Sequence, residues 1–204
     1  MQFILASQSP RRKQLLGEIL NDFEIIPAQG EETCDDAKNC AELVEKLALM
    51  KAREVANLNV AKTKAVLGAD TVVALDGEVM GKPKDEADAR RMLNALSGRT
   101  HEVYTGVCIS VPDKNGRKEF VASACTKVEF YALSAKQIEE YIATGSPMDK
   151  AGAYGIQDGG LVKKIKGSFS CVVGLPQELC KKMIKQATRY ALKIKGEEDV
   201  ETCD

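Results

Sequence analysis

The stretch AVLGADTVVAL, residues 65–75, decides the fold of this chain. Its residues are almost continuously apolar and suited to β structure, which predicts a strand covered on both faces. Asp70 is the exception within it. An ionised carboxylate in apolar surroundings is unfavourable unless it is paired, hydrogen-bonded or bound to a metal. The residues alone therefore leave two interpretations of Asp70 open, a structural salt bridge and a catalytic group.

Upstream of this stretch, the pattern predicts two strands and two helices. Residues 3–6 and 23–27 have the character of short strands. Pro10 suits the first turn of a helix whose apolar residues recur at helical spacing. A longer helix is expected over residues 39–57, and its apolar stripe contains Lys51.

Downstream, strands and helices are joined in two different ways. We expect a helix over 86–96, strands over 101–111 and 119–133, a helix from Ser134 to Ala143, a glycine-rich loop over 152–160, a strand over 161–165 and a helix over 176–187. Residues 113–116 suit a hairpin turn between the two long strands. Because strands connect both through helices and through a hairpin, the pattern favours an α/β fold with a mixed sheet. We expect one domain over residues 1–190 and a polar C-terminal tail over 191–204.

Length and composition exclude several classes of protein. The chain has 204 residues, of which 44% are apolar and 29% charged, and no apolar run approaches the roughly 20 residues that span a bilayer. We therefore expect no membrane role. A net charge of −1 argues against a nucleic-acid partner. The first residues lack the pattern of a signal peptide and the seven cysteines are scattered, so we expect a cytoplasmic protein with reduced thiols.

The segment SQSPRR, residues 7–12, is a candidate phosphate site. It places hydroxyl groups, two guanidinium groups and unpaired backbone N–H groups at the start of a predicted helix. The helix dipole favours an anion there, so the segment can form a phosphate cradle. The alternative is an ordinary capped helix with arginines on its solvated face.

Three further charged residues are candidates for this site, and each also has an ordinary structural interpretation. Lys51 can cover the core with its stem while its ammonium reaches water, or it can meet an anion. Lys82, between Gly81 and Pro83, can be part of a surface turn. Glu32 and Asp70 both stand near ends of predicted strands and are hard oxygen ligands of the kind that Mg²⁺ or Mn²⁺ uses beside a triphosphate. The alternative for Glu32 is a solvated acidic loop.

Five segments, taken together, resemble the ordered motif set of the Maf family. They are LASQSPRR (5–12), GADTVV (68–73), GKP (81–83), DKAGAYGIQ (149–157) and VVGLP (172–176). Each segment alone is weakly specific, but their order extends the resemblance over residues 3–190. The chain is therefore similar to the nucleoside triphosphate pyrophosphatases of this family.

The resemblance implies a fold and an activity. The fold is an elongated mixed β-sheet flanked by helices, with two lobes around a deep cleft, similar to the inosine-triphosphate pyrophosphatase architecture. The activity is hydrolysis of a nucleoside triphosphate between its α and β phosphates, which releases the monophosphate and pyrophosphate. The resemblance also implies a divalent metal cation, Mg²⁺ or Mn²⁺, and a homodimer.

The resemblance further assigns roles by motif position. Asp70 corresponds to the proton acceptor. Glu32 corresponds to an acidic residue of the metal and catalytic region, so Glu32 and Asp70 are the expected metal ligands. The residues that correspond to positions associated with the triphosphate or the metal are Ser7, Arg12, Lys51 and Lys82.

Arg11, Thr71 and Gln157 occupy the positions that the family uses for substrate specificity. This combination resembles the branch that acts on dTTP and UTP, which favours a pyrimidine nucleotide. The amide of Gln157 offers both a donor and an acceptor to a base edge. Two departures bear on the base pocket, because Asp158 stands where the family usually has glycine and Cys171 where asparagine is common.

The sequence has two alternative interpretations of its function. The first alternative is a non-catalytic nucleotide-binding regulator of cell division, because the Maf name is associated with septum formation. The second, a nucleic-acid-binding module, is disfavoured by the near-zero charge and by the lack of a basic run with interleaved aromatic residues. His101, the only histidine, is expected to be structural or solvent-facing rather than catalytic.

Overall fold

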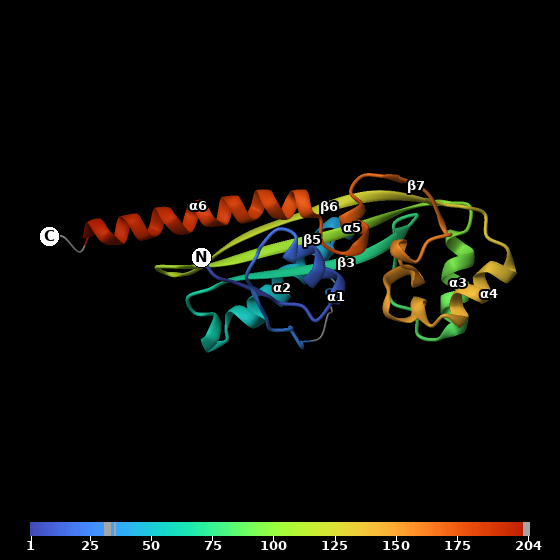
Figure 1. The fold of residues 1–204 in the computed structure, drawn as a ribbon, viewed down its shortest axis with the longest axis horizontal. Helices are drawn as coiled ribbons and strands as arrows, with labels where there is room; N and C mark the ends of the chain where they lie inside the picture. Colours follow the sequence, from blue (N-terminus) through green and yellow to red (C-terminus); the bar gives the residue numbers. More distant parts are fainter. Residues whose placement is uncertain (31–33, 35, 202–204) are drawn as a thin grey trace.

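A computed structural model of the chain describes residues 1–30, 34 and 36–201, with residues 197–201 described by their backbone alone. Within this part of the chain no helix has the length and apolar character needed to cross a bilayer. The six described cysteines are free thiols. Figure 1 shows an elongated molecule in which the strands run along the long axis.

The sheet is mixed, as predicted. Its strand order is β2-β1-β3-β5-β6-β7, and β4 pairs with β3 outside this path. The strands are β1 (Phe3–Leu5), β2 (Glu24–Ile25), β3 (Ala65–Leu75), β4 (Glu78–Met80), β5 (Thr100–Asp113), β6 (Gly116–Phe130) and β7 (Val162–Lys166). The pairs β1 with β2 and β1 with β3 are parallel, whereas the other pairs are antiparallel. Every residue of β3 except Thr71 is buried, in agreement with a strand covered on both faces.

Helices cover both faces of the sheet and one of its ends (Figure 1). They are α1 (Pro10–Gly17), α2 (Cys40–Ala56), α3 (Glu86–Leu96), α4 (Ala135–Ala143), α5 (Phe169–Val173) and α6 (Gln177–Glu201), with 3-10 turns η1 (Asn59–Ala61), η2 (Ser146–Asp149), η3 (Ala151–Ala153) and η4 (Ile156–Asp158). Helix α2 packs on one face of β3 and β5, whereas α1, α5 and α6 belong to a core on the opposite face. Helices α3 and α4 lie at the far end of the sheet, which is the end opposite the tip of the β5–β6 hairpin (Figure 1).

The buried side chains divide into two regions along the sheet. One region combines the cores on the two faces that involve α1, α2 and α6. The other contains α3, α4 and the far halves of β3, β5 and β6. Because one continuous sheet runs through both regions, the chain forms two lobes on a shared scaffold, as the resemblance implied.

Two glycines allow α2 to approach the sheet closely. A Cβ atom at Gly68 of β3 would lie 2.3 Å from the carbonyl oxygen of Ala48, and one at Gly106 of β5 would lie 2.1 Å from the carbonyl oxygen of Val44. Both distances are impossible for a real side chain. The backbone of α2 therefore rests directly on β3 and β5, and the positions of its side chains are fixed relative to these strands.

Several elements differ from the sequence-based prediction. Strand β2 has two residues rather than five, and β4 and α5 were not predicted. Helix α6 does not end near residue 187 but continues to Glu201. The continuation contains no proline, and Gly196 lowers helix stability by only about 1 kcal/mol relative to alanine, which does not end the helix.

His101 is buried in the core of the α3–α4 lobe, where its ring contacts the rings of Phe130 and Tyr154 edge-on. Its Nε2 atom shares a hydrogen bond of 2.7 Å with the hydroxyl of Tyr154. Among the described buried side-chain atoms, His101 Nδ1 lacks a hydrogen-bond partner. Burial lowers the pKa of this imidazole to about 4.

This pKa predicts a stability change with pH. Between pH 6.5 and pH 4 the unfolded chain binds a proton at His101 that the folded chain does not, so stability falls as the pH is lowered through this window. At pH 5 the loss is about 2 kcal/mol. Urea unfolding at pH 7.5 and pH 5 should show a smaller loss for His101→Gln than for the native chain. An equal loss in both proteins would contradict this assignment.

Candidate active site

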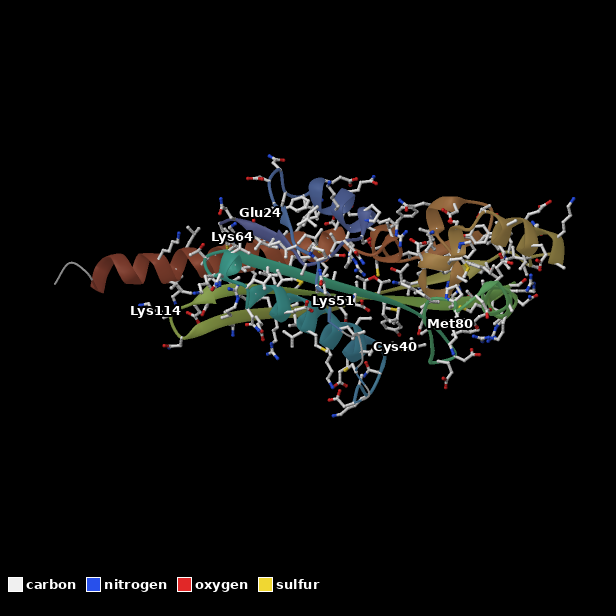
Figure 2. The ribbon with its side chains drawn as sticks, turned by 90° about the horizontal axis from the view of Figure 1, so that it is seen from below. Glu24, Cys40, Lys51, Lys64, Met80 and Lys114 are labelled. Carbon is white, nitrogen blue, oxygen red and sulfur yellow. The ribbon has the colours of Figure 1, made fainter. Side chains whose placement is uncertain are left out.

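A cavity of about 660 Å³ lies where the two lobes meet. Its wall combines the start of α1, the apolar stripe of α2, the middle of β3, the segment 149–157 and the end of α5. Figure 2 shows Lys51, which lines this cavity, between Lys114 at the hairpin tip and Met80 along the long axis. The cavity is thus the deep cleft that the resemblance implied.

Asp70 and Lys51 form an ion pair on the cavity wall. Asp70 points from β3 toward α2, and its Oδ1 atom lies 2.5 Å from Nζ of Lys51. The side chains are only 8% and 12% exposed. Lys51 reaches Asp70 because the Gly68 and Gly106 contacts hold α2 against the sheet. The pair explains how a charged residue is accommodated in an otherwise apolar strand, and both residues still border the cavity.

Arg12 is held at the start of α1 by three described hydrogen bonds. Its Nε donates to the carbonyl oxygen of Gly174 at 3.0 Å, its Nη1 to Ser7 Oγ at 3.4 Å and its Nη2 to Thr71 Oγ1 at 3.2 Å. Ser9 caps the helix by accepting from the Arg12 backbone N–H. The start of α1 therefore presents a fixed guanidinium and the positive end of a helix dipole to the cavity, which suits an anion.

An ion pair joins the two lobes across the cavity. Nη1 of Arg11 in α1 lies 3.2 Å from Oδ2 of Asp149 in η2. Oδ1 of Asp149 accepts from Lys150 at 2.7 Å, and Lys150 also donates to the backbone and the hydroxyl of Ser146. Burial raises the pKa of Asp149, but the bonds from Lys150 and Arg11 outweigh this effect and leave the pKa below its usual value. Asp149 therefore remains ionised and orients Arg11.

Gln157 lies on turn η4 at the cavity edge, and the neighbouring Asp158 anchors that turn. Oδ2 of Asp158 accepts hydrogen bonds from the hydroxyls of Tyr141 at 2.5 Å and Ser146 at 2.6 Å. The Tyr141 hydroxyl in turn accepts from the backbone N–H of Gly155. Asp158 is not part of the cavity wall. It acts on the cavity indirectly, by tying the turn that carries Gln157 to α4 and η2.

Cys171, the other departure from the family pattern, is also outside the cavity wall. Its thiol is fully buried and lies 3.4 Å from the carbonyl oxygen of Ala124 and 3.6 Å from that of Val103. Burial raises the pKa of this thiol. The side chain therefore fixes α5 to the sheet and does not form part of the pocket surface.

The structure brings most of the predicted site residues together. The cavity is lined by Arg11, Arg12, Lys51, Asp70, Thr71, Lys82 and Gln157. Ser7 is buried behind the wall and contacts Arg12. Glu32 lies outside the described residues, and within the described part of the chain no three His, Cys, Asp or Glu side chains form a group that could hold a metal.

Sequence reasoning missed Asp149 and Thr105 as parts of this site. Asp149 stands in a recognised motif, but the sequence does not reveal that its partner is Arg11, 138 positions away. Thr105 is fully buried on β5 directly opposite Thr71 and bonds to it. A threonine in a strand is ordinary, so only the register of the two strands reveals the pair.

The order and spacing of these residues match a known family. The family model described as Maf-like protein matches residues 2–187, which is nearly the whole chain. The chain belongs to the Maf family.

Relatives of this Maf protein carry a consistent name. A protein of Thermococcus gammatolerans named dTTP/UTP pyrophosphatase is 48% identical to this chain over 182 residues. A protein of Agathobacter rectalis with the same name is 47% identical to it over 189 residues. The alignments cover 88% and 86% of this chain, and 94% and 92% of the relatives. Among solved structures, the Ham1 protein of Staphylococcus aureus is similar with a TM-score of 0.48 at 20% identity, over 79% of this chain and 91% of that protein.

Proposed function

We propose that this Maf protein hydrolyses dTTP, UTP or modified pyrimidine nucleotides between the α and β phosphates and releases the monophosphate and pyrophosphate. The observation that carries the proposal is the buried Asp70 carboxylate, which borders a cavity together with Arg11, Arg12, Lys51 and Lys82. A triphosphate needs several cationic groups near its oxygens, and hydrolysis needs a group that orients or deprotonates water. The name shared by the relatives supports the same reaction and the same pyrimidine substrates.

The proposed roles follow from position. Asp70 positions or deprotonates the water that attacks the α phosphorus. Arg11, Arg12, Lys51 and Lys82 stabilise the negative charge that develops on the phosphates. Ser7 supports this group through its bond to Arg12. Arg11, Thr71 and Gln157, at the positions that the family uses for specificity, select the base.

We further propose that Asp70 and Glu32 hold a divalent cation, Mg²⁺ or Mn²⁺. Asp70 offers a hard oxygen at the cavity, and Mg²⁺ is commonly held by one or two carboxylates together with phosphate oxygens of the substrate. Asp70 is the proposed ligand that lies in the described part of the chain, and it also pairs with Lys51, so a cation held here would depend on the nucleotide for most of its ligands. When bound, such a cation neutralises phosphate charge.

The assembly state and the cellular location of this Maf protein can both be measured. We propose that it forms a homodimer, because the resemblance implies one, and that it resides in the cytoplasm. Size-exclusion chromatography with light scattering tests the first, and a mass equal to a single chain contradicts it. Fractionation of the source cells tests the second.

A panel of nucleoside triphosphates with Mg²⁺ or Mn²⁺ tests the activity. We expect pyrophosphate and the monophosphate as products, with dTTP and UTP hydrolysed fastest. Release of orthophosphate alone points to a different phosphohydrolase. Tight binding of UTP without pyrophosphate release over hours supports the alternative, a non-catalytic nucleotide-binding regulator.

A further inference from the structure

A line of hydrogen bonds leads from the protein interior to the cavity through two threonines. The hydroxyl of Thr105 lies 2.8 Å from the carbonyl oxygen of Cys171 and 2.9 Å from the hydroxyl oxygen of Thr71. Thr71 Oγ1 also accepts from Nη2 of Arg12 at 3.2 Å. Thr105 is fully buried, whereas Thr71 is half-buried and lines the cavity.

The direction of each bond follows from counting protons. A carbonyl oxygen can only accept, and a threonine hydroxyl has a single proton. If the Thr105 proton did not point to Cys171, two oxygen atoms 2.8 Å apart would face each other with lone pairs in the dry interior. Thr105 therefore donates to Cys171 and accepts from Thr71. The only proton of the Thr71 hydroxyl consequently points inward.

Thr71 can then only accept hydrogen bonds from the cavity side. Its proton is used by Thr105, one lone pair receives Arg12, and the remaining lone pair is available to a ligand. We propose that Thr105 is a positioning residue that makes Thr71 an acceptor on the cavity wall, and that this selects nucleobases with a ring N–H. This inference rests on the proposed function, in which Thr71 contacts the base.

The selection distinguishes two classes of pyrimidine. Uracil and thymine carry a proton on N3 and can donate it to Thr71. Cytosine has a lone pair on N3, so the same pose places an acceptor against an acceptor. A site that hydrogen-bonds a substrate N–H discriminates strongly against an analogue that lacks it, because the buried partner is left unpaired. Thr105 thereby controls the choice between UTP and CTP without touching either.

Thr105→Val and Thr105→Ser form the matched test. Valine keeps the branched shape but removes the hydroxyl, so the Thr71 proton can turn toward the cavity and meet N3 of cytosine. Serine keeps the hydroxyl. Pyrophosphate release with Mg²⁺ gives kcat/KM for UTP and CTP, and we expect the UTP/CTP ratio to fall about tenfold or more in Thr105→Val and to be kept in Thr105→Ser. A ratio unchanged in Thr105→Val, with both rates lowered equally, overturns the inference.

Two further measurements keep the inference separate from folding and from the proposed function. If Thr105→Val does not fold, Thr71→Val removes the acceptor on the half-buried wall and should reduce the UTP/CTP ratio to a similar extent; an unchanged ratio overturns the inference. If the native chain releases no pyrophosphate, the proposed function fails, and calorimetry with α,β-methylene UTP and α,β-methylene CTP measures the same ratio as binding. A native chain that hydrolyses UTP and CTP equally overturns the inference while the pyrophosphatase activity stands.

Discussion

Replacing Asp70 with asparagine should lower kcat for pyrophosphate release by at least about 100-fold. The amide keeps the shape of the side chain but cannot take a proton from water. The substitution removes a negative charge beside the cationic groups, which favours binding of the triphosphate, and it removes a proposed metal ligand, which saturating Mg²⁺ compensates. Binding of the triphosphate should therefore change much less than kcat. Steady-state measurements with UTP and Mg²⁺ should therefore show a large loss in kcat and a small change in KM.

A matched carboxylate serves as the control for this variant. Asp76 lies in the turn between β3 and β4 and pairs with Arg99 on the exposed surface, away from the cavity wall. Asp76→Asn should retain turnover close to that of the native chain. Near-normal turnover in Asp70→Asn, with circular dichroism like that of the native chain, rules out Asp70 as the group that activates water.

The second large effect is expected at Gly106. An alanine Cβ would lie 2.1 Å from the carbonyl oxygen of Val44, so α2 must move away from β5. Overpacking typically costs about 1–3 kcal/mol, and here the obstacle is backbone, so we expect a loss of about 3 kcal/mol in the free energy of unfolding. In a chain of this size that lowers the thermal midpoint by roughly 6–12 °C. Since α2 also carries Lys51, kcat/KM should fall too.

Gly17→Ala is the control for this prediction, because nothing lies within 4 Å of the added Cβ and the residue is in helix α1. Differential scanning calorimetry of both variants gives the comparison. Gly17→Ala should leave the midpoint unchanged or slightly higher. A midpoint for Gly106→Ala within about 2 °C of the native chain, less than 1 kcal/mol, would mean that α2 does not rest on the sheet as described.

Features with local causes were predictable from sequence. Asn39 and Ser134 accept from backbone N–H groups three residues later, so the starts of α2 and α4 depend on neighbouring residues alone. Asp70 was noticeable because a charge interrupts an apolar run. The motif resemblance then added what spacing cannot supply, namely that Asp70, Lys51 and Lys82 belong to one site, and all three line the cavity.

Features with distant causes were not predictable. Helix α5 has only five residues, and its position depends on the bond from Thr105 on β5 to the carbonyl oxygen of Cys171. Strand β4 has three residues and exists because Met80 pairs with Val73 on β3. Neither element has a repeat long enough to show periodicity, so tertiary contacts that the sequence does not display decide both.

The two ends of the strand order also limit how copies of this chain can associate. An unpaired strand edge attracts the backbone of another molecule, and short length or lysine side chains suppress that attachment. One outer strand, β2, offers only two residues, and the other, β7, carries Lys163, Lys164 and Lys166 among its five. At β2 and β7 themselves, pairing with the backbone of another molecule is therefore discouraged. Because β7 pairs with β6 only from Lys127 to Phe130, the outer edge of the earlier part of β6 is where a second backbone would find room to pair.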